Sequence, residues 1–185
     1  MTQPTAKKRG GSSSKVKGSA FERELCKQLS LWISHGIRDD LYWRSATSGG
    51  RATVHGKKGK GLEHVAGDIC AIHPDGKPLT DQFFLEAKHY QNPEWHKFFL
   101  TASGPVQAFW EKLTEQADSY QKFPILIVKQ NMYPIQVVCL SRMFRVLDCS
   151  TADLEEIYLR HRFLSVITFN SFLTIPPEKL LWTKS

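Results

Sequence analysis

The sequence predicts an α/β protein in which a central mixed β-sheet is flanked by helices. Two observations carry this prediction. Segments with helical periodicity alternate with short strand-like runs, in the order helix, strand, a pair of strands, helix, strand. Apolar residues make up 41% of the 185 residues, which is enough to form the core of one domain.

The first helix is predicted over residues 19–34. Apolar side chains such as Phe21, Leu25 and Leu29 fall on one arc of the helix. Glu22 lies within that arc, whereas Glu24 faces solvent. A carboxylate on a buried face needs a salt bridge to a basic neighbour, a metal ion or a functional reason, and these readings stay open.

The segment before the first helix and the segment after the first predicted strand are both basic and lack a hydrophobic pattern. Residues 1–17 contain five lysines or arginines and no acid, which predicts a disordered basic arm. A short strand is expected over 41–46. The glycine-rich run that follows, to residue 64, carries Lys57, Lys58 and Lys60 and is expected to be a mobile loop. It suits either contact with a phosphate backbone or a plain surface loop.

The run from Asp68 to Lys88 is predicted to be a β-hairpin with its turn at residues 74–78. Centred near residue 77, this hairpin places Asp68 opposite Glu86, with Cβ atoms about 4.5–5.5 Å apart. Two carboxylates that close are destabilising unless a positive group lies between them. A divalent cation and Lys88 would supply that charge, and oxygen ligands favour Mg²⁺ or Mn²⁺ over zinc.

The second half of the chain predicts further elements. A connection without regular structure is expected over 92–104, and a helix over 105–121, since Pro105 suits a first helical turn. The remaining expected elements are strands over 123–130, 135–140 and 165–168 and a helix over 151–160.

Charge and cysteine usage narrow the class of protein. The formal net charge of +7 makes DNA a reasonable partner, although charge alone fits any basic protein equally well. The four cysteines form no CxxC pair, so a structural zinc site is not expected. No secretory or membrane-spanning run is visible. The expected compartment is a reducing cytoplasm, of a bacterium or a phage-infected host cell, with no membrane partner.

Four short motifs together carry a family resemblance. They are 18–25 (GSAFEREL), 43–46 (WRSA), 67–68 (GD) and 86–88 (EAK), in this order. This series resembles the PD-(D/E)XK nuclease superfamily, and within it the archaeal-type and phage Holliday junction resolvases. The resemblance implies a restriction-endonuclease-like core over about 18–130 with a C-terminal extension over 131–185, both in a single domain.

The resemblance also implies roles for individual residues. Glu22, Asp68 and Glu86 would bind a divalent metal, Mg²⁺ or Mn²⁺, and Lys88 would be the catalytic lysine beside them. Gly67 stands where the superfamily pattern has proline. Positions associated with DNA or the active site correspond to Arg23, Arg44, Ser48 and Lys129. The positive charge of the glycine-rich loop adds expected phosphate contacts at Arg51, Lys57, Lys58 and Lys60.

The sequence therefore predicts a metal-dependent DNA endonuclease, structure-specific on branched DNA and working as a homodimer. Two alternatives stay open. One is a restriction-like or nicking phage-type endonuclease that acts on duplex DNA. The other is a non-catalytic DNA-binding module of the same fold, although Asp68, Glu86 and Lys88 are all present.

Overall fold

A mixed β-sheet of five strands, in the order β3-β4-β5-β7-β6, forms the centre of this computed structural model. The structure describes residues 11–45, 67–145, 155–159 and 162–181. The sheet strands are Phe83–His89 (β3), Phe123–Lys129 (β4), Gln136–Leu140 (β5), Glu155–Leu159 (β6) and Arg162–Thr168 (β7). The helices are α1 Gly11–Ile33, α3 Lys77–Gln82, α4 Trp95–Thr101, α5 Gly104–Ser119, α6 Arg142–Arg145, α7 Phe169–Thr174 and α8 Pro177–Leu180, with a 3₁₀ turn η2 at Pro74–Gly76.

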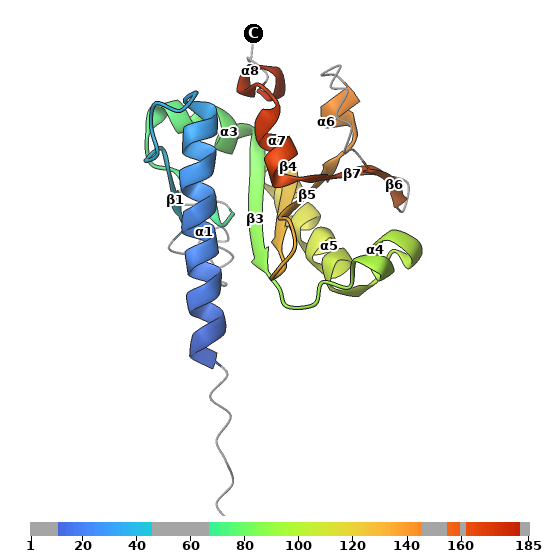
Figure 1. The fold of residues 1–185 in the computed structure, drawn as a ribbon. Helices are drawn as coiled ribbons and strands as arrows, with labels where there is room; N and C mark the ends of the chain where they lie inside the picture. Colours follow the sequence, from blue (N-terminus) through green and yellow to red (C-terminus); the bar gives the residue numbers. More distant parts are fainter. Residues whose placement is uncertain (1–10, 46–66, 146–154, 160–161, 182–185) are drawn as a thin grey trace, which may run out of the picture.

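The strand directions explain how the chain crosses the sheet. β3 and β4 pair in parallel, whereas β4–β5, β5–β7 and β7–β6 are antiparallel pairs. A parallel pair requires a long crossover, and α4 with α5 provides it (Figure 1). β4 is a nearly continuous buried apolar run, as expected for a parallel strand covered on both faces, whereas β3 is apolar only in its first half and carries Glu86, Lys88 and His89 in its second.

Helices cover both faces of the sheet near β3. Side chains alternate along a strand, so Phe84 and His89 point to opposite faces. The ring of Phe84 contacts Tyr120, which follows α5, and the His89 ring contacts Phe21 of α1. α1 and α5 therefore lie on opposite faces (Figure 1). At the other end of α1, the Trp32 indole donates a hydrogen bond of 2.8 Å to the carbonyl of Ile175.

Two short strands form a separate antiparallel ribbon that packs beside α1. They are β1, Tyr42–Arg44, and β2, Ile69–Ala71. The buried hydroxyl of Ser30 on α1 accepts hydrogen bonds from the backbone N–H groups of Leu41 and Tyr42, at 3.1 and 3.2 Å. This contact ties the start of β1 to the helix, so the ribbon has a defined position relative to α1.

The predicted hairpin from Asp68 to Lys88 is wrong. The first strand, β2, pairs with β1, and the second, β3, pairs with β4. The predicted turn at 74–78 is the 3₁₀ turn η2 followed by α3, a connection too long for a tight hairpin. The apolar first half of β3 is buried, and β3 pairs with the buried strand β4 of the central sheet rather than with β2.

Other predicted boundaries also change, while the fold class is confirmed. α1 begins at Gly11, so residues 11–17 are helical rather than part of a disordered arm, and α4 occupies part of the predicted connection 92–104. Residues 155–159 of the predicted helix 151–160 form strand β6, because backbone pairing with β7 overrides local helical periodicity. The predicted extension 131–185 supplies three strands to the central sheet. Among the described residues, no helix is long and apolar enough to span a bilayer.

One stability prediction arises from α1. Gly18 lies within this helix, and a Cβ atom placed there would meet nothing within 4 Å. Gly18→Ala is therefore expected to raise the free energy of unfolding by about 0.5–1 kcal/mol, because alanine loses less backbone entropy than glycine in a helix. Thermal unfolding of both proteins measures this difference. An unchanged or lower midpoint would mean that α1 is not continuous through residue 18.

Candidate active site

Asp68 is placed at the edge of β3 by two hydrogen bonds. Its backbone N–H donates to the carbonyl of Leu85 at 2.9 Å, and its Oδ2 accepts from the backbone N–H of Ala87 at 2.9 Å. These two contacts bracket Glu86. Asp68 is only 6% exposed, so its carboxyl group lies beside the strand and is largely excluded from solvent. The proximity of Asp68 to Glu86 thus holds although the predicted hairpin does not.

The ammonium group of Lys88 lies near both Asp68 and Glu86. Glu86 and Lys88 share one face of β3, and the Lys88 Nζ forms an ion pair with Glu86 Oε1. The same Nζ lies 3.8 Å from Asp68 Oδ2 and 6.0 Å from the centre of the Phe109 ring. A single ammonium group therefore lies near both carboxylates and near an aromatic ring of α5.

The pKa values of this cluster are shifted by burial and by charge. Burial, followed by the neighbouring charge of Glu86, raises the pKa of Asp68 to about 7, although Lys88 and the hydrogen bond from Ala87 oppose the shift. Burial lowers the pKa of Lys88, but Glu86 and Asp68 raise it by more, so that its net shift is upward. The lysine is charged at neutral pH, and the site holds more negative charge than one lysine neutralises.

Glu22 faces the protein interior from α1, as its position on the helical arc predicted. Its side chain is 13% exposed, and Arg44 on β1 donates a hydrogen bond from Nε to Glu22 Oε2 at 2.9 Å. This salt bridge is one of the readings left open for Glu22. Its negative charge also contributes to the raised pKa of Asp68, so Glu22 belongs to the same electrostatic environment.

The arrangement fits a divalent cation through its donor chemistry. Asp68 and Glu86 offer carboxylate oxygens at one place, and burial, followed by the charge of Glu86, disfavours the ionised Asp68 that a cation would stabilise. The described part of the chain contains no cluster of three or more acidic, histidine or cysteine side chains arranged to hold a metal. Glu22 is instead held by Arg44.

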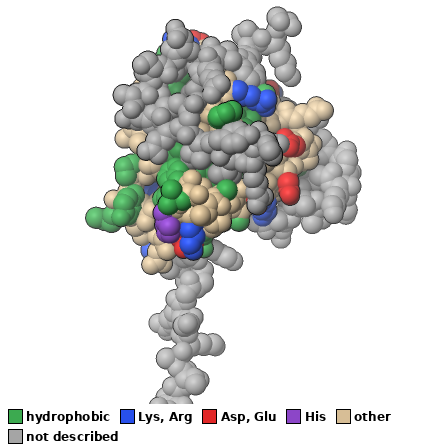
Figure 2. All heavy atoms as spheres, turned by 90° about the vertical axis from the view of Figure 1, so that its right-hand side faces the viewer, with side chains coloured by type: hydrophobic (Ala, Val, Ile, Leu, Met, Phe, Trp, Pro, Cys, Tyr) green, Lys and Arg blue, Asp and Glu red, His purple; other side chains and the backbone are tan. Residues whose placement is uncertain are grey.

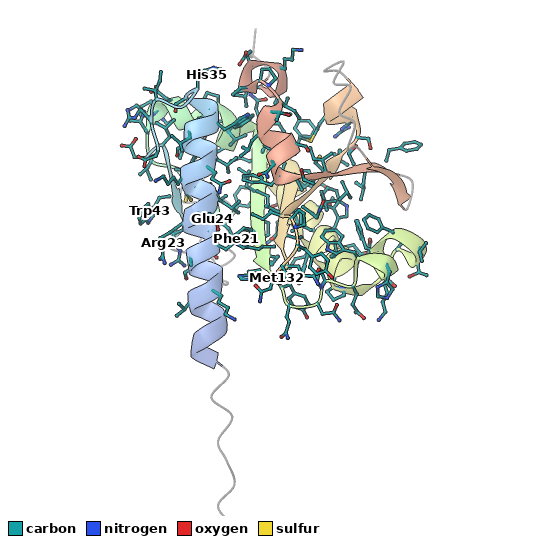
Figure 3. The ribbon with its side chains drawn as sticks, viewed as in Figure 1. Phe21, Arg23, Glu24, His35, Trp43 and Met132 are labelled. Atoms are coloured by element: carbon teal, nitrogen blue, oxygen red, sulfur yellow. The ribbon has the colours of Figure 1, made fainter. Side chains whose placement is uncertain are left out.

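The predicted DNA-contacting residues divide into two groups. Arg23 is exposed on α1, next in sequence to Glu22 (Figure 3). The Lys129 Nζ lies 2.8 Å from Glu24 Oε2 and 5.2 Å from the centre of the Phe21 ring, and Arg44 pairs with Glu22. The other predicted contacts lie outside the described residues: Ser48, Arg51, Lys57, Lys58 and Lys60.

Gly67 is a residue whose importance the sequence motif did not reveal. Its φ is +95°, and a Cβ atom there would lie 2.7 Å from the carbonyl oxygen of Leu85. Only glycine allows Asp68 to approach β3 this closely. Proline, the residue of the superfamily pattern, has φ fixed near −65° and does not fit this conformation. A glycine directly before the motif's aspartate was the available signal.

Comparisons with known proteins identify one family. A family model described as "Phage putative PDDEXK endonuclease" matches residues 13–181 of this chain. The match therefore includes the strands after residue 130 as well as the motifs. Neither the curated proteins nor the solved structures contain a significant match.

Proposed function

The chain belongs to this phage family of PDDEXK endonucleases, and hence to the PD-(D/E)XK nuclease superfamily, and from this premise we propose the following function. The protein is a divalent-metal-dependent DNA endonuclease that hydrolyses phosphodiester bonds with structure specificity for branched DNA. Asp68, Glu86 and Lys88 form its catalytic centre, Glu22 supports them, and the enzyme works as a homodimer.

The cluster of Asp68, Glu86 and Lys88 is the observation that carries this proposal. The three groups come from two separate segments, yet the Lys88 Nζ contacts both carboxylates. A structural ion pair needs only one carboxylate for each ammonium group. Here a second carboxylate is buried beside the same ammonium group, and the pKa of Asp68 is raised as a result. Such an unfavourable arrangement of charges is typical of catalytic sites rather than of structural ion pairs.

Each residue has a role that follows from its position. Asp68 and Glu86 would hold Mg²⁺ or Mn²⁺, with Glu22 as a further candidate; the metal, when bound, lowers the pKa of a water molecule and offsets phosphate charge. The Lys88 ammonium group stabilises negative charge that develops on the phosphate or orients the attacking water. The hydrogen bond from Ala87 keeps Asp68 in place during the reaction. Cleavage in line would leave a 5′ phosphate and a 3′ hydroxyl.

The proposed preference for branched DNA is supported by the motif order, which resembles that of junction resolvases, and by the net charge of +7. Such charge favours the dense phosphates around a branch point without reading base sequence. Cleavage of ordinary duplex DNA is the second candidate function. It is supported by the breadth of the family description, which specifies no DNA structure.

The substrate and the metal are tested together. The full-length protein is incubated with four-way junction, flap, single-stranded and duplex DNA, each with Mg²⁺, with Mn²⁺ or with a chelator. We expect paired incisions in the junction at a rate about tenfold or more above that of duplex, and no cleavage with chelator. Equal rates on junction and duplex would favour the second candidate function, and cleavage that persists in chelator would contradict metal dependence.

A further inference from the structure

Trp43 is a large aromatic side chain that the fold leaves exposed on a fixed strand. Its side chain is 54% exposed, while the preceding Tyr42 is only 1% exposed. The β1 strand thus alternates from a buried tyrosine to an exposed tryptophan and a half-buried arginine. Tryptophan is usually well buried, so a half-exposed indole on a paired strand is available to a ligand.

The backbone of Trp43 is placed near the candidate active site by its neighbour in sequence and by its strand partner. The next residue, Arg44, pairs with Glu22 of α1 at 2.9 Å, and Trp43 lies opposite Cys70 in the β1–β2 register. Strand β2 begins directly after Asp68. The backbone of Trp43 is therefore one residue from the salt bridge and across the ribbon from the strand that follows Asp68, while its ring points to the ribbon face opposite to that of Arg44.

The surroundings of Trp43 are suited to a phosphate backbone. Arg23 is exposed and follows Glu22 on α1, and Trp43 precedes Arg44 on β1. Because Glu22 and Arg44 form an ion pair, the backbones of Arg23 and Trp43 lie near each other; both labels lie on one side of α1 in Figure 3. The view in Figure 2 shows the side of the molecule that carries α4 and β6, away from β1. There the described acidic and basic side chains lie scattered, without a continuous basic strip among them.

We propose that Trp43 is a stacking platform for an unpaired nucleobase of the DNA substrate, with Arg23 binding the adjacent phosphate; this inference rests on the proposed nuclease function. The flat face of an indole ring stacks on any base, and an arginine next to it neutralises the neighbouring phosphate. The bases within a continuous duplex already stack on each other. Only a flap, a gap or a branch point offers a free base face, so this platform selects DNA structure rather than sequence.

A second copy of the chain is a less suitable occupant. A two-fold contact through Trp43 would be self-complementary and would bring the Arg23 side chains of both copies to the same surface. Like charges in one contact are unfavourable, whereas DNA brings the opposite charge.

Binding assays test the platform. They use the full-length chain carrying Asp68→Asn, which prevents cleavage, and two probes: a duplex with a short oligothymidine flap and the same duplex without it. We expect Trp43→Ala to weaken binding of the flap probe about tenfold or more, the effect of one stacked base, and to affect the plain duplex less. Trp43→Phe retains most of the affinity for the flap. Flap binding quenches tryptophan fluorescence, and Trp43→Phe removes part of that quenching.

An exposed aromatic residue of the central sheet, rather than of the β1–β2 ribbon, provides a matched control. Phe163 is 49% exposed on β7, three strands and about 14 Å across the sheet from β3. Phe163→Ala should bind both probes as the parent does. Thermal unfolding confirms that each variant is folded. If Trp43→Ala does not fold, Trp43→Phe provides the test.

Three results would overturn the inference. The first is equal flap affinity in Trp43→Ala and its parent while the unmutated enzyme still cleaves DNA, which rejects the platform but leaves the nuclease function intact. The second is a change from dimer to monomer in Trp43→Ala with unchanged flap affinity, which assigns Trp43 to a contact between copies. The third is a protein that neither binds nor cleaves either probe, which rejects the proposed function and the platform together.

Discussion

Asp68→Asn is expected to abolish DNA cleavage and, at pH 8, to make the protein more stable. Asparagine has nearly the same shape, and its side-chain oxygen can still accept the hydrogen bond from Ala87, but it brings no negative charge to a metal. We expect a loss of about 10³-fold or more in the cleavage rate. The measurement is nicking of supercoiled plasmid with Mg²⁺ by the two proteins.

The gain in stability follows from the pKa of Asp68. Folding raises this pKa from its usual 3.8 to about 7, because burial and Glu86 disfavour the ionised form. Below pH 3.8 the carboxyl group is protonated in both the folded and the unfolded protein, and it costs nothing. As the pH rises toward 7 the unfolded state ionises first, so stability falls, and the full cost is present above pH 7.

Asp68→Asn removes this cost, which is about 4 kcal/mol for a pKa that rises from 3.8 to about 7, at 1.36 kcal/mol per pKa unit. Urea unfolding at pH 8 and near pH 4 should show the variant more stable at the higher pH, with the difference almost gone at the lower pH. A pH-independent difference would contradict the raised pKa. Asp39→Asn is the control, since Asp39 is 56% exposed and its salt bridge with Lys27 is on the surface, where such pairs contribute little.

Gly67→Ala is expected to damage both stability and cleavage. The new Cβ atom would lie 2.7 Å from the Leu85 carbonyl oxygen, which is a backbone atom of β3 and cannot move aside like a flexible side chain. The backbone would also be strained at a φ of +95°. Relief requires Asp68 to move away from the strand, which breaks its bonds to Leu85 and Ala87. We expect a loss of about 2–5 kcal/mol in the free energy of unfolding.

Gly36→Ala is the control that distinguishes the steric clash at Gly67 from the backbone strain of a positive φ. Gly36 has a similar φ of +85°, but a Cβ atom there meets nothing within 4 Å. Gly36→Ala should cost only about 1–2 kcal/mol and leave cleavage intact. Gly67→Ala should also lower cleavage about tenfold or more under conditions where the protein remains folded, because Asp68 is displaced from Glu86 and Lys88. Equal losses in the two variants would show that Asp68 is not held by its contact with β3.

Several parts of the fold could be predicted from local pattern because the relevant forces are local. The apolar arc of Phe21, Leu25 and Leu29 predicted a helix whose buried face is the observed one. The apolar run of β4 predicted a buried strand. The predicted boundaries of helices and strands were wrong where the local sequence did not clearly favour one type of secondary structure. Residues 155–159 have helical spacing but pair with β7, and the charged composition of residues 11–17 does not prevent them from continuing α1.

By itself the sequence determined the fold class and the superfamily, and it supplied Glu22, Asp68, Glu86 and Lys88 as the proposed catalytic groups, since residue identity and motif order are written along the chain. Only the tertiary structure decided how these groups meet. It placed Asp68 beside β3 without a hairpin, paired Glu22 with Arg44, and left the Trp43 side chain exposed to solvent. The reason is physical: periodicity depends on neighbours a few residues apart, whereas strand pairing and burial depend on contacts between segments distant in sequence.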